Sequence, residues 1–185
     1  DVVFAIDSTG SMKDDIEVVE EGLSIVSKET DRLIILVNDL LDFSRLQAHR
    51  IELKKEEFSI SDLLENIIGQ FTVRCQQERI KMMLLTDNQE SWVFADYNRL
   101  KQVLINVVDN AMKFTVGRPN AEIRISSQVL DDQIIVIVED NGSGISPEDL
   151  QRVKEKFYKG SSNKSGTGLG LSIASEIMEL HGGKM

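Results

Sequence analysis

Apolar residues recur along much of this chain at helical spacing, and the longest such stretch lies near the N-terminus. Between residues 12 and 50 they follow one another three or four positions apart, and over residues 33–43 they approximate a heptad seam. This pattern predicts one long helix that packs against another helix, in the same chain or in a second copy. The second copy is favoured because the chain offers no partner helix of similar length.

A second helical stretch, residues 100–115, carries two stripes. Its apolar stripe consists of Leu100, Leu104, Val107, Ala111 and Phe114, with Asp96 upstream as the expected N-cap. Asn106, Asn110 and Lys113 lie four and three positions apart and therefore share another face. Amide oxygens ligate hard cations such as Mg2+, and a lysine supplies a point charge for phosphate. A solvated polar face explains this second stripe equally well, so the choice depends on residues further along.

Shorter apolar segments predict the remaining elements. We expect strands at residues 2–6, 51–58, 82–85, 92–95, 122–126 and 133–139, the last of them buried. Further helices are expected from Ser61, from Ser146 to about Tyr158, and over residues 171–180. Strands and helices mixed in this order predict an α+β fold with one sheet covered on one face by helices.

Composition limits the classes of partner. The 185 residues are 41% hydrophobic, enough for one good core, and the net charge of −10 argues against a general nucleic-acid or anionic-membrane surface. Any phosphate site must therefore be local. The apolar runs are too short to cross a bilayer, and no basic signal-peptide start is present, so we expect no membrane contact from this segment. The single cysteine, Cys75, fits a packing role in a cytoplasmic protein.

Two glycine-rich segments follow the two-stripe helix. Asp140, Gly142 and Gly144 come directly after a predicted strand, where a buried carboxylate would select adenine by accepting from its exocyclic amine; an ordinary Asp-Asn-Gly turn is the simpler alternative. The run Gly166-Thr167-Gly168-Leu169-Gly170 opens the last helix, whose free N–H groups would cradle phosphates. Lys156, Lys159 and Lys164 precede it, where a lid over a triphosphate would need them.

In their order and spacing these motifs, together with the Phe157-Tyr158 pair, resemble the N, G1, F and G2 boxes of sensor histidine kinases of two-component systems. The resemblance covers roughly residues 30–185, because residues 30–46 also resemble the second helix of that family's dimerisation domain. It implies a Bergerat ATP-binding fold, a two-layer α/β sandwich shared with gyrase, the ninety-kilodalton chaperone and MutL, preceded by a long dimerisation helix.

The resemblance also implies a role for each matching position. Asn106, Lys113 and Lys159 would be catalytic, and Asn110 and Asn106 would hold Mg2+. The ATP-binding positions would be Asn106, Asn110, Lys113, Asp140, Gly142, Gly144, Ile145, Phe157, Tyr158, Gly166, Thr167, Gly168, Leu169 and Gly170.

Asn106 distinguishes kinases from hydrolases within that superfamily. Hydrolytic members typically place a glutamate there as a general base, and an amide cannot accept the proton. Asp109 is expected to point away from the direction of Asn106 and so not to replace that base. Transfer of a phosphoryl group to a histidine depends more on positioning and charge neutralisation than on a base, and this site suits it.

The sequence departs from the family at the phosphoacceptor. It contains no His-Glu/Asp-x-x-x-Pro motif, and its only histidines, His49 and His181, are expected at the surface. We therefore expect an ATP-binding catalytic core that phosphorylates a histidine of an intact parent or partner, with a response regulator as the downstream partner. A non-catalytic nucleotide-binding dimerisation module is the alternative.

Both ends of the chain raise a question. Residues 1–11 resemble the first strand and metal loop of a von Willebrand factor A domain, with Asp7, Thr9 and Ser11 as oxygen ligands, but the distant loops that complete such a site have no room here. Residues 12–50 are expected to form the partial dimerisation domain and residues 51–185 the ATP-binding domain. Because family members continue past Gly182-Gly183 with further strands, we expect an exposed sheet edge.

Overall fold

The structure, a computed structural model, describes residues 9–47, 52–86, 91–131, 133–160 and 167–185. The chain divides into two compact units, Asp1–Leu41 and Asp42–Met185, each described here by itself. The elements are α1 (Thr9–Gln47), β1 (Glu56–Ser59), α2 (Ile60–Glu78), β2 (Lys81–Thr86), β3 (Trp92–Ala95), α3 (Tyr97–Thr115), β4 (Glu122–Leu130), β5 (Gln133–Asp140), α4 (Pro147–Leu150) and α5 (Gly170–Leu180).

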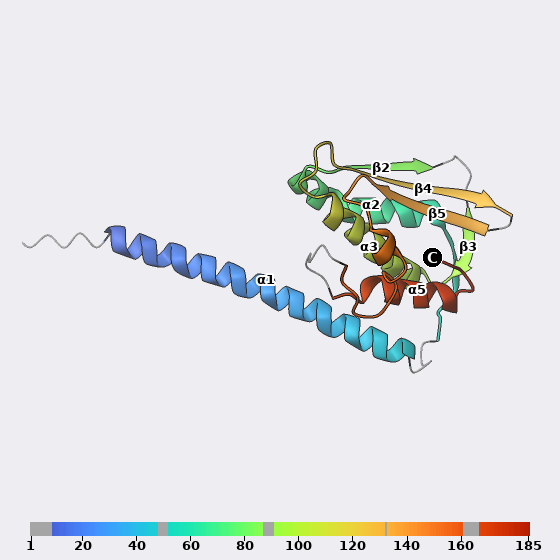
Figure 1. The fold of residues 1–185 in the computed structure, drawn as a ribbon, viewed down its shortest axis with the longest axis horizontal. Coiled ribbons are helices and arrows are strands. Elements are labelled where there is room, and N and C mark those ends of the chain that lie inside the picture. Colours follow the sequence, from blue (N-terminus) through green and yellow to red (C-terminus); the bar gives the residue numbers. More distant parts are fainter. Residues whose placement is uncertain (1–8, 48–51, 87–90, 132, 161–166) are drawn as a thin grey trace, which may run out of the picture. The chain divides into compact units, whose positions relative to one another are not determined.

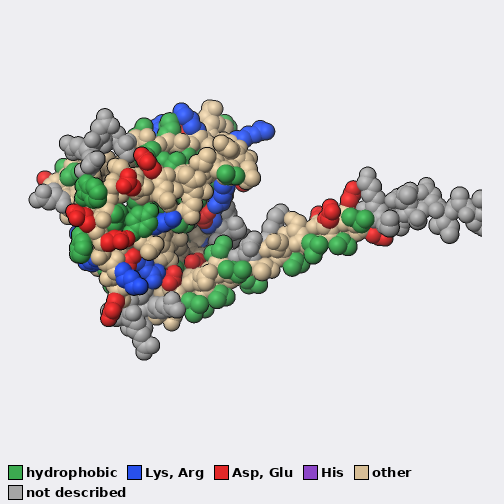
Figure 2. Space-filling model, turned by 180° about the vertical axis from the view of Figure 1, so that it is seen from behind, with side chains coloured by type: hydrophobic (Ala, Val, Ile, Leu, Met, Phe, Trp, Pro, Cys, Tyr) green, Lys and Arg blue, Asp and Glu red, His purple; other side chains and the backbone are tan. Residues whose placement is uncertain are grey.

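The first unit is formed by most of the long helix α1. Many of its apolar side chains are at least half exposed, and hydrophobic groups follow the helix in Figure 2. These residues are Ile16, Val18, Val19, Leu23, Ile25, Val26, Leu33, Ile34, Ile35, Val37, Leu40 and Leu41. The helix already begins at Thr9, three residues before the start that the apolar pattern predicted at residue 12. The expected strand at residues 2–6, together with Asp7, lies outside the described residues.

The described strands of the second unit form two sheets, where the sequence predicted one. Strand β4 pairs in parallel with β2 and antiparallel with β5, whereas β1 and β3 form a separate antiparallel pair. The pairing of β4 with β5 ends at Ile123 opposite Asp140, next to the loop with the first glycine motif. Strand β1 runs from Glu56 to Ser59, so it starts later than the expected strand over residues 51–58 and ends one residue further on, at Ser59, which caps α2 with its hydroxyl.

Helices α2 and α3 cover one face of the β2–β4–β5 sheet, and α5 packs on α3 (Figure 1). The main core lies between this sheet and the two helices, and its fully buried side chains are Leu63, Leu64, Ile67, Val108, Met112, Ile123 and Ile125. A second core cluster joins α3 to α5 and consists of Val103, Leu169, Ile173, Ala174 and Ile177. Helix α3 is therefore fixed from two sides.

Packing on two sides changes which residues of α3 are buried. Val103, Val108 and Met112 are buried, while Val107 and Phe114, expected in the apolar stripe, are only partly covered. The expected N-cap is confirmed, because Asp96 accepts a hydrogen bond from the Arg99 amide at 3.1 Å. Helix α3 thus holds its polar face in a fixed orientation.

Two expectations about the C-terminal half need correction, and one about Cys75 in α2 is supported. Ser146 caps α4 as expected, but the helix ends at Leu150 and not near Tyr158. Beyond it the backbone makes three-residue turns, with the Arg152 N–H donating to the Asp149 carbonyl oxygen at 2.9 Å, and the φ of 62° at Phe157 excludes a helix that reaches Tyr158. Strand β5 is partly covered and not buried. Cys75 is buried, and burial raises the pKa of its thiol, which fits packing. In the part of the chain that the structure describes, no helix is both long and apolar enough to cross a membrane.

Candidate functional site

The polar face of α3 meets the start of α5. The Asn106 side chain donates a hydrogen bond from Nδ2 to the carbonyl oxygen of Gly170, at 3.0 Å. No side chain caps the first turn of α5, whose N-cap residue is Leu169. Asn106, one of the two amides expected to ligate a cation, therefore lies beside the N-terminus of α5, where backbone N–H groups and the helix dipole favour an anion.

Asn110 and Lys113 lie one and two turns further along α3, partly covered on the same face. Lys113 is already in an ion pair, with Nζ 2.6 Å from Asp109 Oδ2, and Arg74 of α2 contacts the other oxygen of Asp109 at 2.6 Å. Burial alone would raise the pKa of Asp109, but the hydrogen bonds and charges of Lys113 and Arg74 outweigh it and hold the pKa below its ordinary value. Asp109 thus points toward α2, whereas Asn106 points toward α5, as its position on the helix predicts.

The loop after β5 approaches the other end of α3. Ser143 donates from its backbone N–H to the carbonyl oxygen of Phe114, at 3.3 Å. A Cβ atom at Gly142 would lie 2.8 Å from that same oxygen and 2.6 Å from Asp140 Oδ1, so only glycine fits there without displacement. One helix thus contacts the second glycine motif near Asn106 and the first near Phe114, eight residues or about 12 Å apart along its axis.

Asp140 is exposed, and the sequence expectation of a buried carboxylate is wrong. It occupies the last paired position of β5, and its Oδ1 accepts from the Gly142 N–H at 2.8 Å. The exposure follows from its place at the end of the strand, next to a loop with little side-chain volume. Its second oxygen has no partner among the described residues, so the carboxylate is oriented and still able to accept a hydrogen bond.

The Phe157-Tyr158 pair contacts the second glycine motif through the backbone. Gly168 has a φ of 74°, and a Cβ atom there would lie 2.7 Å from the Phe157 carbonyl carbon. The Tyr158 hydroxyl donates to Asp149 Oδ1 at 2.5 Å, and this hydrogen bond raises the pKa of Tyr158. Residues 157–158 are therefore fixed to α4 on one side and to Gly168 on the other.

The remaining candidates divide into four groups. Ile145 and Lys159 are exposed, as is the Phe157 ring. Thr167 and Leu169 lie at the start of α5, where the Thr167 hydroxyl accepts from the Leu169 N–H at 3.1 Å. Gly144 has a φ of 72° in the exposed loop after β5. Gly166 and Lys164 lie outside the described residues.

One residue taken for a surface residue holds two elements together. His181 is half-buried: its Nδ1 lies 2.8 Å from the Ile177 carbonyl oxygen, and its Nε2 accepts from the backbone N–H of Asp96 at 3.1 Å. The imidazole links the end of α5 to the N-cap of α3. A lone histidine in a terminal turn carries no sequence signal for such a contact, which depends on tertiary structure.

Comparisons with known proteins define the class of this site. Residues 95–185, which include α3 and both glycine motifs, match the family of histidine kinase-, DNA gyrase B- and HSP90-like ATPases. The sensor protein SrrB of Staphylococcus aureus (strain MRSA252) is 36% identical over 171 residues, which cover 90% of this chain and 29% of SrrB. The chain thus spans less than a third of the length of that relative.

Solved histidine kinases share the fold. A structure of full-length ShkA in complex with AMPPNP superposes with a TM-score of 0.77 at 29% identity over 88% of this chain and 34% of that one. The catalytic domain of the histidine kinase ThkA superposes with a TM-score of 0.61 at 33% identity, over 70% of this chain and 81% of that one. A structure of ThkA in complex with the response regulator TrrA superposes with a TM-score of 0.71 at 29% identity, over 90% of this chain and 46% of that one. The chain belongs to the histidine kinase family and contains its nucleotide-binding catalytic domain.

Proposed function

We propose that this chain binds Mg-ATP across α3 and transfers the γ-phosphoryl group to a histidine of a two-component signalling protein. The observation that supports this most strongly is the double contact of α3, with the Gly170 carbonyl at Asn106 and with the Gly142 loop at Phe114. A nucleotide lying along the polar face of this helix would have its base near the Asp140 loop and its phosphates near the start of α5.

Each segment has a role in this proposal. Asp140 accepts from the adenine amine with the oxygen that Gly142 does not use, and Gly142 and Gly144 let the base approach the backbone closely, beside Ile145. Asn110 and Asn106 hold Mg2+, whose remaining ligands are water and phosphate oxygens. Thr167, Gly168, Leu169 and Gly170, with Gly166, present backbone N–H groups to the phosphates.

The charged groups set the chemistry. Lys159, exposed beside Phe157 and Tyr158, supplies positive charge to the developing phosphoryl transition state, and Lys113 shares its charge between Asp109 and the phosphates. The Asn106 amide cannot accept a proton from water, and Asp109 is held as a carboxylate between two cations away from α5. Transfer to an already nucleophilic imidazole needs neither group as a base, so positioning favours transfer over hydrolysis.

The proposal extends to partners. The exposed apolar side chains of α1 would pair with a second copy, giving a homodimer through this helix. The acceptor histidine would lie in the intact parent or in a partner, because this sequence lacks the family motif. A response regulator would receive the phosphoryl group, by analogy with the ThkA–TrrA complex. Family membership favours this catalytic reading over the non-catalytic module.

A transfer assay tests the proposal. The chain would be mixed with a separate acceptor-helix fragment and ATP labelled at the γ position, and the label followed in the presence and absence of Mg2+. We expect Mg2+-dependent label on the fragment that is lost in acid and kept in base, as for phosphohistidine. Label released only as free phosphate would indicate a hydrolase, and nucleotide binding without transfer would support the non-catalytic alternative.

A further inference from the structure

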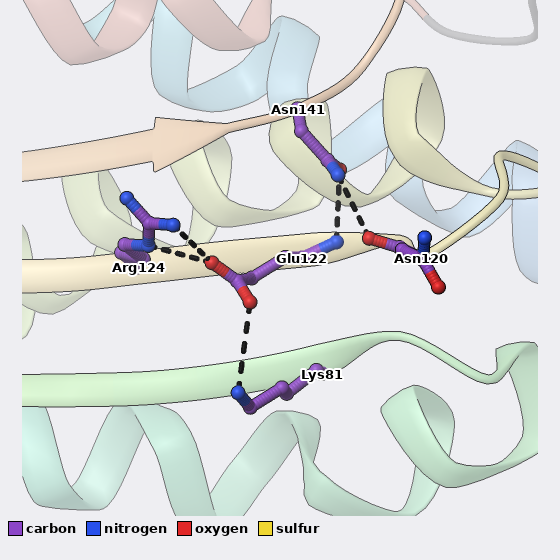
Figure 3. Close-up of polar contacts among 5 residues, drawn as sticks. All are labelled: Lys81, Asn120, Glu122, Arg124 and Asn141. Carbon is purple, nitrogen blue, oxygen red and sulfur yellow. Dashed lines mark hydrogen bonds and ion pairs between the residues drawn. The ribbon is translucent and has the colours of Figure 1, made fainter.

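The loop that follows Asp140 is joined to the start of β4 by one side chain, Asn141. Its Oδ1 accepts from the Glu122 N–H at 2.8 Å, and its Nδ2 donates to the Asn120 carbonyl oxygen at 2.8 Å (Figure 3). The backbone N–H of Asn141 also donates to the Glu122 carbonyl oxygen, at 3.2 Å. A single residue therefore makes three hydrogen bonds to two residues, Asn120 and Glu122, of another segment.

These bonds continue the strand pairing past its last regular position. The pairing of β4 with β5 ends at Ile123 opposite Asp140, and Asn141 satisfies both the N–H and the carbonyl of the next residue, Glu122. The Glu122 carboxylate is itself held by Arg124 at 2.6 Å and Lys81 at 3.6 Å. Asp140 is thus clamped from both neighbours in the chain, by the pairing before it and by Asn141 after it.

The segment that receives Asn141 is shaped for this contact. Asn120 has a φ of 53°, in the left-handed region. Two residues earlier, Arg118 donates from Nη2 to the Gly142 carbonyl oxygen at 2.8 Å. The turn between α3 and β4 therefore makes hydrogen bonds to the loop after Asp140 at two positions, Asn141 and Gly142.

These hydrogen bonds hold the backbone next to Asp140, whose side chain is exposed and gains little orientation from packing. A recognition group has to be held to about 0.5 Å for its hydrogen bond to discriminate between ligands. We propose that Asn141, assisted by Arg118, is a positioning residue that sets the preference of this site for adenine over guanine nucleotides; the inference rests on the proposed function.

Calorimetry with Mg2+ measures the affinities of the Asn141→Ala and Asn141→Asp variants for ATP and GTP and so tests this inference. The aspartate variant keeps the acceptor for the Glu122 N–H but places an oxygen against the Asn120 carbonyl oxygen. We expect the ATP affinity of both variants to fall about five- to tenfold, with GTP affinity changed less than about twofold. Asp140→Asn should lower the same ratio. Asn66→Ala, at an exposed position of α2, is the matched control and should leave both affinities unchanged.

A purely structural role gives a different result. Asn141→Ala would then lower the melting temperature while the ratio of ATP to GTP affinity stayed at the wild-type value, and that outcome overturns the inference. Arg118 provides a second test if the Asn141 variants fold poorly. Arg118→Ala should lower the ratio of ATP to GTP affinity, and Arg118→Lys, which retains a donor, should keep most of it. Equal ratios in both variants and the wild type would contradict the inference. A wild-type chain without preference for ATP would refute the proposed function itself.

Discussion

The close approach of Gly168 to Phe157 is tested by a single type of substitution, glycine to alanine, at three positions. At Gly168 the added Cβ would meet backbone atoms, 2.7 Å from the Phe157 carbonyl carbon and 2.9 Å from the Tyr158 oxygen, at a φ of 74°. Gly117 has a similar φ of 79° but no atom within 4 Å of an added Cβ. Gly69, inside α2, has neither constraint.

The expected free energies of unfolding follow from these differences. Gly69→Ala should stabilise the domain by about 0.5–1 kcal/mol, because alanine is the better helix former. Gly117→Ala should destabilise it by about 1 kcal/mol through the left-handed backbone alone. Gly168→Ala adds a clash with peptide atoms that no side-chain rotation relieves, and should cost about 3 kcal/mol.

Urea denaturation followed by circular dichroism measures the three values, and calorimetry with a non-hydrolysable ATP analogue measures binding. We expect the Gly168 variant to lose at least about tenfold in nucleotide affinity, because a shift at this position also displaces the start of α5, while the Gly69 variant binds as the wild type does and the Gly117 variant loses less than the Gly168 variant. Equal stability and affinity for the Gly117 and Gly168 variants would refute the contact between Gly168 and residues 157–158.

Two further predictions concern α3. Asp109→Asn should destabilise the domain by about 1 kcal/mol at neutral pH, because it removes the carboxylate that pairs with Lys113 and Arg74. The pKa of Asp109 is lower in the folded than in the unfolded chain, so its contribution is complete above the unfolded pKa and is lost as the pH falls through the folded pKa. Unfolding measured from pH 7 to pH 3 should show the wild type and variant converging in acid, and a constant difference would contradict the ion-pair role. Asn110→Ala should abolish the Mg2+ dependence of ATP affinity with the melting temperature unchanged, and calorimetry showing an unaltered Mg2+ effect would remove Asn110 from the metal site.

The sequence predicted elements well where local signals agreed. The Asp96 cap, helix α3, the start of α4 and the alternation of β4, with Ile123 and Ile125 buried, depend on spacing and capping chemistry within a few residues. Features set by tertiary contacts were wrong or absent. After the early end of α4, the left-handed φ of Phe157 and the hydrogen bond of Tyr158 to Asp149 fix a turn that no local pattern encodes.

The candidate site divides in the same way. The order of the motifs predicted the family, and the similarity to known histidine kinases confirms that prediction. The sequence could not predict that Asp140 is exposed, that Arg74 of α2 contacts Asp109, or that Asn141 joins its loop to β4. Each of these depends on which segment lies opposite in space, and an Asn-Gly turn looks the same whether or not its amide reaches another strand.

Nuclear magnetic resonance tests most directly that one nucleotide contacts all of these segments. Isotope-labelled protein would be titrated with an ATP analogue and Mg2+, and the side-chain amides of Asn106 and Asn110 followed with the backbone amides of Gly142 and Gly168. We expect all four signals to shift with one common dissociation constant. Shifts confined to one segment, or different constants for the Gly142 and Gly168 signals, would contradict a single site along α3.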